Sequence, residues 1–222
     1  MQAKMDEEDL HAEIPSWGEE IERRRIAAHE AGHAAMLVRY GQKLTSLSID
    51  PAHRFGQHTR GDGSYEHFLQ TISILTAGRT GVLLSFPDKD SVFWNRGCDM
   101  DFQVLDETIE EFWTRERLHG IENVRAAIRQ LNDEATRINS NGSSQHADPT
   151  APEAELMVLP TNAVLTNLAD FVAFNLSISM LKAKGSFKAL ALARERVLTE
   201  TTVTDVELLS NQMREAIESE RN

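Results

Sequence analysis

Two histidines and a glutamate lie in a short run of small residues, and this run restricts the possible fold more than any other feature of the sequence. Its sequence is His29-Glu30-Ala31-Gly32-His33, and alanines flank it on both sides. Residues four positions apart lie on the same face of an α-helix, so a helix would point both imidazoles in one direction. A glycine inside a helix costs about 1 kcal/mol relative to alanine, which a close approach by another segment would explain. The run therefore predicts a helix that a second segment approaches closely at Gly32.

The same five residues form an H-E-x-x-H motif, whose spacing suits metal chemistry. Two imidazoles on one helix face can bind a single metal ion, most typically Zn²⁺. The metal lowers the pKa of a bound water toward about 7, and Glu30 is placed to take the proton as the water attacks a carbonyl. A solvated polar helix face would explain one histidine, but not two with a glutamate between them. We predict that His29 and His33 are metal ligands and that Glu30 is the catalytic base and acid.

A catalytic zinc site also needs a third protein ligand and an open fourth position. Acidic residues are concentrated where a predicted loop meets a predicted helix; they are Asp99, Asp101, Asp106, Glu107, Glu110 and Glu111. An aspartate at the start of a helix is commonly a cap or a partner of the helix dipole. The residues alone therefore do not single out the third ligand.

Apolar residues recur at helical spacing along most of the chain. A capping box of Ser16 and Glu19 begins the motif helix, and Gly41 ends it. A second capping box, Thr204 with Glu207, begins the last helix. The predicted helices span residues 16–40, 66–86, 100–118, 121–138, 162–182, 186–199 and 205–218, with a loop over 87–97.

One segment instead alternates with the period of a half-exposed strand. Within residues 44–50, Thr45, Leu47 and Ile49 alternate with Ser and Asp, and a second short strand could end near Thr59. We therefore predict a mainly α fold of the α+β type, with one small β-sheet. An exposed sheet edge beside the motif helix would suit an extended substrate peptide, held at Thr45, Leu47 and Ile49 by β-augmentation. An ordinary edge strand explains the pattern equally well.

Composition divides the chain into four parts. Residues 1–15 are polar and predict a flexible N-terminus. Residues 16–138 contain the motif and predict a zinc peptidase core. Residues 139–155 are rich in Ser, Asn, Gly and Pro and predict a flexible linker. Residues 156–222 predict a C-terminal helical part that packs on the core.

Charge and composition exclude several classes of protein. The chain has 35 acidic and 23 basic residues, a net charge of −12, which disfavours nucleic-acid binding. Cys98 is the single cysteine, so neither a disulfide framework nor an all-cysteine zinc site is available. The N-terminus has no secretory signal. The apolar stretch 163–181 contains Asn167, Asp170 and Asn175, which predicts a buried core helix rather than a membrane span. We expect a cytoplasmic protein.

The segment IAAHEAGHAAM resembles the site helix of the FtsH-type ATP-dependent zinc metalloproteases. Segments 55–59, 75–79 and 97–103 resemble that family in the same order, and residues 189–209 resemble its closing helices. The resemblance implies a helical, zincin-like metalloprotease domain with Zn²⁺ as its cofactor. It also implies that Asp101 is the third ligand. The sequence departs from the family at residues 80–84, where acidic residues are usual, and at Ala28, where an aromatic residue is usual.

The resemblance implies an endopeptidase that acts on peptides or unfolded proteins. The 222 residues contain no G-x-x-x-x-G-K-[ST] phosphate loop. Either the substrate is already accessible, or a separate ATPase or adaptor delivers it. The family works as rings, which leaves a homo-oligomer open, although a net charge of −12 per subunit would make a ring self-repulsive at low salt.

Two other functions stay open. A small regulatory protease with the same motif would take its third ligand from Glu107, Glu110 or Glu111. A non-catalytic binding or adaptor module would instead use the metal structurally, with a fourth protein ligand such as Cys98. The presence of Glu30 argues against a purely structural metal, because such a site has no use for a general base.

Overall fold

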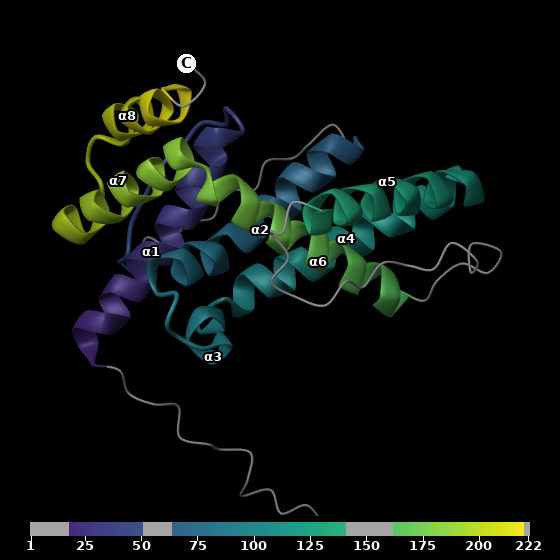
Figure 1. The fold of residues 1–222 in the computed structure, drawn as a ribbon, viewed down its shortest axis with the longest axis horizontal. Coiled ribbons are helices and arrows are strands. Elements are labelled where there is room, and N and C mark those ends of the chain that lie inside the picture. Colours follow the sequence, from purple (N-terminus) through teal and green to yellow (C-terminus); the bar gives the residue numbers. More distant parts are fainter. Residues whose placement is uncertain (1–17, 51–63, 141–161, 220–222) are drawn as a thin grey trace, which may run out of the picture.

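A computed structural model describes residues 18–50, 64–140 and 162–219 of the chain. Helices account for nearly all of the regular structure in these ranges (Figure 1). The helices are α1 (Glu19–Arg39), α2 (Tyr65–Ser85), α3 (Ser91–Asn95), α4 (Asp99–His119), α5 (Ile121–Ser140), α6 (Asn162–Lys182), α7 (Lys184–Glu200) and α8 (Val206–Glu218). The helical periodicity of the sequence therefore predicted every long helix and most of its bounds.

The predicted β-sheet is wrong for the described residues. Their only strand-like pairing is an isolated antiparallel bridge between Ser48 and Thr202. Leu44 and Leu47 are buried in a core formed by helices, but Thr45 is exposed and Ser48 is buried, so burial in this segment does not follow the alternation. Any second strand near Thr59 falls outside the described ranges.

Side-chain caps mark the start of helices α2, α3 and α8. Helix α1 begins after Gly18 without one, and its predicted cap, Ser16, lies outside the described residues. The Ser64 hydroxyl accepts a hydrogen bond from the His67 amide at the start of α2. Asp205, rather than the predicted Thr204, caps α8 by accepting from the Leu208 amide at 2.9 Å. Helix α3 lies in the predicted loop 87–97; Asp90 caps it, and Phe93 anchors it in the core.

The two largest of four apolar clusters in the described ranges, here called the first and second cores, lie on either side of α2 (Figure 1). The first joins α1, α7 and α8 to the C-terminal half of α2. The second joins α4, α5 and α6 to its N-terminal half, with the Phe68 and Phe112 rings stacked at 3.8 Å. Helix α2 is thus shared by both cores, which fixes it between the two groups of helices.

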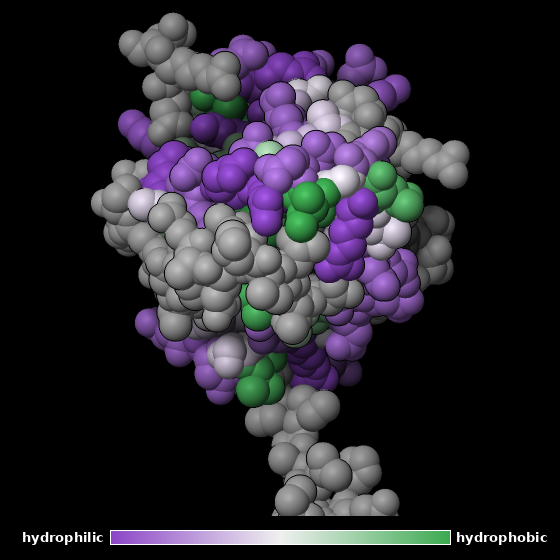
Figure 2. Space-filling view, turned by 90° about the vertical axis from the view of Figure 1, so that its right-hand side faces the viewer, coloured by the Kyte–Doolittle hydropathy of each residue, from purple (hydrophilic) through white to green (hydrophobic). Residues whose placement is uncertain are grey.

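Helix α6 is long and apolar enough to cross a membrane by length and composition alone, but 67% of that stretch is buried inside the fold. Leu165, Leu168 and Val172 have no exposed surface and lie in the second core. This burial favours the core-helix interpretation. Figure 2 shows one face of the molecule, where the described surface is mostly hydrophilic with isolated hydrophobic groups.

Helices α1 and α2 pack at backbone contact. A Cβ added to Gly32 would lie 2.1 Å from the Ala77 carbonyl oxygen, and one added to Gly81 would lie 2.3 Å from the Ala28 carbonyl oxygen. The close approach predicted at Gly32 is confirmed, and the approaching segment is α2. No residue larger than glycine fits at either position unless the helices separate.

The Gly81→Ala substitution tests this packing, because two effects oppose each other. Helix propensity alone would stabilise the protein by about 1 kcal/mol. The clash with the Ala28 carbonyl would cost about 1–3 kcal/mol, as for other overpacked cores. We expect a lower free energy of unfolding in urea. Thr114→Ala, at an exposed position inside α4, is the matched control and should leave stability unchanged or slightly higher. An equal rise in both variants would contradict the close approach.

Candidate metal centre

Three side chains from two helices meet at one point beside α2. His29 and His33 come from α1, and Asp101 comes from the first turn of α4. Asp101 Oδ2 lies 3.0 Å from His29 Nε2 and 3.3 Å from His33 Nε2, and the two Nε2 atoms are 3.2 Å apart. The structure thus brings together the three residues predicted as ligands, although Asp101 is 68 residues from His33.

These three atoms have the spacing that a zinc ion requires. With zinc–ligand bonds of about 2.0–2.1 Å, the ligand atoms of a tetrahedral site are about 3.3–3.4 Å apart. The observed separations of 3.0–3.3 Å are close to that value. Two imidazoles and one carboxylate are also a donor set that zinc prefers. The side chains therefore fit a zinc ion held by three protein ligands.

Helix α2 forms the wall behind the imidazoles. A Cβ added to Gly78 would lie 2.5 Å from both His29 Cε1 and His33 Nε2, so only glycine leaves room for the two rings. One turn earlier, the Ile74 carbonyl oxygen lies 2.8 Å from His33 Nδ1. A carbonyl can only accept, so His33 Nδ1 carries a hydrogen, and in the neutral ring Nε2 keeps its lone pair for a metal.

Cys98 adjoins the cluster from another side. Its thiol is fully buried, donates to the Trp94 carbonyl oxygen at 3.5 Å and lies 3.7 Å from His29 Nδ1. Ligand atoms of His29, Cys98 and Asp101 lie within 4.8 Å of one another. Burial, with the Asp101 charge, raises the pKa of Cys98 to about 12, so the group is a thiol at neutral pH. Its contact is with Nδ1 of His29, whereas Nε2 faces Asp101.

The charges of the cluster stabilise one another. Burial alone would lower the pKa of His33, but the carboxylates of Asp101 and Glu30 and the Ile74 carbonyl raise it to about 9. Burial opposes ionisation of Asp101, yet the two imidazoles hold the pKa of its carboxyl far below the ordinary range. The metal-free cluster therefore holds a proton between His33 and Asp101 at neutral pH.

Glu30 lies beside these residues without being tied to them. It is half-buried and forms no hydrogen bond or ion pair with another residue of the described ranges. Its charge still contributes to the raised pKa of His33, so its carboxylate is near the cluster. A proton-accepting role requires a carboxylate near the reacting atoms, and the position of Glu30 beside the cluster is consistent with that role.

The other predicted site residues lie elsewhere. Glu107, Glu110 and Glu111 are exposed on α4, and Glu107 accepts a hydrogen bond from Gln103. Thr45, Leu47 and Ile49 form no strand, because within the described part of the chain their segment pairs only through one isolated bridge. There the Leu47 carbonyl accepts from the Val203 amide, and the Ile49 amide donates to the Thr201 carbonyl. These bonds tie the segment to the connection between α7 and α8. The predicted sheet edge is thus reduced to one bridge, at Ser48, and substrate binding at these residues stays a prediction.

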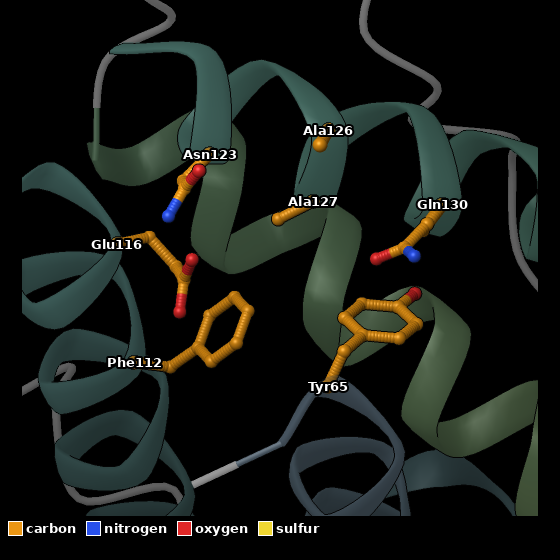
Figure 3. Close-up of a pocket in the computed structure, with 7 residues that line it drawn as sticks. All are labelled: Tyr65, Phe112, Glu116, Asn123, Ala126, Ala127 and Gln130. Carbon is orange, nitrogen blue, oxygen red and sulfur yellow. The ribbon is translucent and has the colours of Figure 1, made fainter. Parts of the chain in front are cut away.

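A separate pocket lies between α4 and α5 (Figure 3). Its volume is about 140 Å³, and its lining residues are Tyr65, Phe112, Glu116, Asn123, Ala126, Ala127 and Gln130. It shares no lining residue with the metal cluster, and its one carboxylate, Glu116, pairs with Arg115 at 3.2 Å. The pocket offers no set of metal ligands, so the cluster of His29, His33 and Asp101 stays the candidate metal site among the described residues.

Comparison with protein-family models, with curated proteins and with solved structures gives no match. The resemblance to the FtsH-type proteases stays a prediction that rests on the motifs alone. Sequence reasoning did not assign a role to Gly78, although it lies in the segment 75–79 that carries part of this resemblance. It also gave no role to the Ile74 carbonyl, because a backbone atom carries no sequence signal.

The raised pKa of His33 makes the stability of the metal-free protein depend on pH. A group whose pKa is higher in the folded state stabilises the fold below its unfolded pKa and stops doing so above its folded pKa. With a chelator present, we expect the free energy of unfolding to fall as pH rises from 6.5 to about 9. Urea unfolding across this window measures it. Asp101→Asn should flatten the dependence, whereas Asn at the exposed neighbour Asp99 should keep it. A slope that survives in Asp101→Asn would refute the pairing.

Proposed function

We propose that this chain is a zinc-dependent endopeptidase. The observation that carries the proposal is the triangle of His29 Nε2, His33 Nε2 and Asp101 Oδ2, with sides of 3.0–3.3 Å. Such an arrangement brings three candidate ligand atoms to one point in a largely buried site. Three protein ligands leave a fourth position for water or substrate, as catalytic zinc sites require.

The residues around the triangle have separate tasks in this proposal. When bound there, zinc would polarise the scissile carbonyl and lower the pKa of the attacking water. The carboxylate of Glu30 would accept the proton of that water and return it to the leaving amine. The Ile74 carbonyl would keep the proton of His33 on Nδ1, and the charge of Asp101 would partly balance that of the cation.

A second candidate, a binding module with a structural metal, is favoured by the position of Cys98. Its sulfur lies close to His29 and Asp101, and a fourth protein ligand would close the site. One observation weighs against this alternative. The thiol contacts His29 Nδ1 rather than Nε2, the nitrogen that faces Asp101.

The decisive test of catalysis is Glu30→Gln. We expect the purified parent protein to degrade an unfolded substrate such as casein, and the variant to lose at least about 100-fold in rate, the usual contribution of a general base. Both proteins should keep about one zinc per chain by elemental analysis, because three protein ligands are sufficient. The control is Glu20→Gln, an exposed glutamate of α1, which should cleave at the parent rate. Full activity in Glu30→Gln would sink the mechanism.

A set of alanine variants identifies the third ligand. We expect Asp101→Ala to lose most of its zinc, whereas Glu107→Ala, Glu110→Ala and Glu111→Ala should bind zinc as the parent does, because those three side chains are exposed on α4. Zinc dissociation constants from competition with a coloured chelator make the comparison. Loss of zinc only in a glutamate variant would support the regulatory-protease alternative. Loss of zinc in Cys98→Ser would support the closed, structural site.

A further inference from the structure

A buried arginine lies one helical turn before His29. Arg25 is 4% exposed, and its Nε and Nη2 donate to both carboxylate oxygens of Glu22 at 3.0 and 2.8 Å. This bidentate pair fixes the plane of the guanidinium. The remaining nitrogen, Nη1, donates to the carbonyl oxygen of Arg96, 71 residues away. Arg25 thus links α1 to the connection between α3 and α4.

That connection leads directly to the third ligand of the cluster. Gly97 has φ +75°, and a Cβ there would lie 3.1 Å from Arg25 Nη2, so the chain passes against the guanidinium. Cys98 follows, and Asp101 lies in the first turn of α4. The start of α4 has no side-chain cap of its own. The position of this turn therefore depends on contacts from outside the helix, and Arg25 supplies one of them.

A neighbouring ion pair on α1, Arg24–Glu20, provides an exposed comparison for the Arg25–Glu22 pair. Arg24 and Glu20 make the same kind of contact at 2.8 Å, but their side chains are 59% and 64% exposed. Exposed pairs of that kind contribute little to stability. Burial of Arg25 carries a desolvation penalty, so its ion pair with Glu22 does not by itself explain why it is buried. Unlike Arg24, Arg25 also donates to the Arg96 carbonyl, in the turn before Asp101.

We propose that Arg25 is a positioning residue, which holds the Asp101 carboxylate at the cluster through the Arg96–Gly97 turn. This inference rests on the proposed zinc site. Arg25 acts on the position of a ligand and does not itself contact the metal. We therefore expect removal of Arg25 to weaken zinc binding.

The test compares Arg25→Met with Arg24→Met in the full chain. Zinc dissociation constants are measured against a chromogenic chelator, and circular dichroism checks the fold of the metal-free proteins. We expect Arg25→Met to weaken zinc binding about 10- to 100-fold, the range seen when groups that orient metal ligands are removed. Arg24→Met should stay within about twofold of the parent, since an exposed pair contributes little. Equal affinities in the two variants would overturn the positioning role.

A double-mutant cycle with Asp101→Ala separates positioning from general destabilisation. If Arg25 acts through Asp101, adding Arg25→Met to Asp101→Ala should change the zinc affinity by less than about twofold, because the coupled group is already gone. An undiminished loss in that background would mean that Arg25 acts on the whole fold, and the positioning role would be wrong. A parent protein that binds no zinc would instead overturn the zinc site, and the positioning role with it.

Glu22→Gln is the second variant, and it decides the question if Arg25→Met does not fold. It keeps the shape of the partner and removes the charge that orients Arg25 and also faces the Arg96 guanidinium at 3.9 Å, so both contacts that hold this turn weaken. We expect zinc binding to weaken in the same direction by a smaller factor, with Glu20→Gln as the exposed control. Unchanged affinity in Glu22→Gln would overturn the inference.

Discussion

The contact between α1 and α2 is the constraint on which the rest of the structure depends. Gly32 and Gly81 let the two backbones touch, and Gly78 lets the backbone of α2 lie against the imidazoles of α1. Because no side chain separates the helices, the Ile74 carbonyl reaches His33 directly. A short run of small residues thus sets the helix spacing, the burial of the histidines and the orientation of one imidazole. The same helix packing therefore determines both the fold and the geometry of the site.

Because the cluster is buried, the negative charge of Asp101 needs a positive charge beside it. Two ring nitrogens and a carboxylate oxygen lie within 3.3 Å of one another, and the carboxylate is mostly withdrawn from water. Without a cation, a proton on His33 provides the charge, which explains its raised pKa. A metal ion would have to displace that proton, because a ligating histidine must be neutral at its ligating nitrogen. A proton and a metal ion therefore compete for the same atom, His33 Nε2.

The sequence predicted the parts of the fold that depend on local order. The helices followed from apolar periodicity, and the pairing of His29 with His33 followed from their spacing of four. The small sheet was wrong because the alternation in residues 44–50 does not match burial: Thr45 is exposed and Ser48 is buried, and Leu44 and Leu47 pack on helices. Asp101 was reached only through resemblance, and Arg25 was not reached, since its partner Arg96 is 71 residues away.

The two ends of α4 are held by different kinds of contact. The C-terminal part of α4 lies in the second core, where Ile109, Phe112 and Trp113 pack among apolar side chains. Its first turn lies among polar groups instead, with Arg25 behind residues 96–97 and Arg79 beside Phe102 at 5.3 Å. Apolar packing is non-directional and supplies stability, whereas a bidentate guanidinium fixes orientation. A helix held by apolar contacts at one end and by arginines at the other can be stable along its length and still place one carboxylate within hydrogen-bonding distance of two imidazoles.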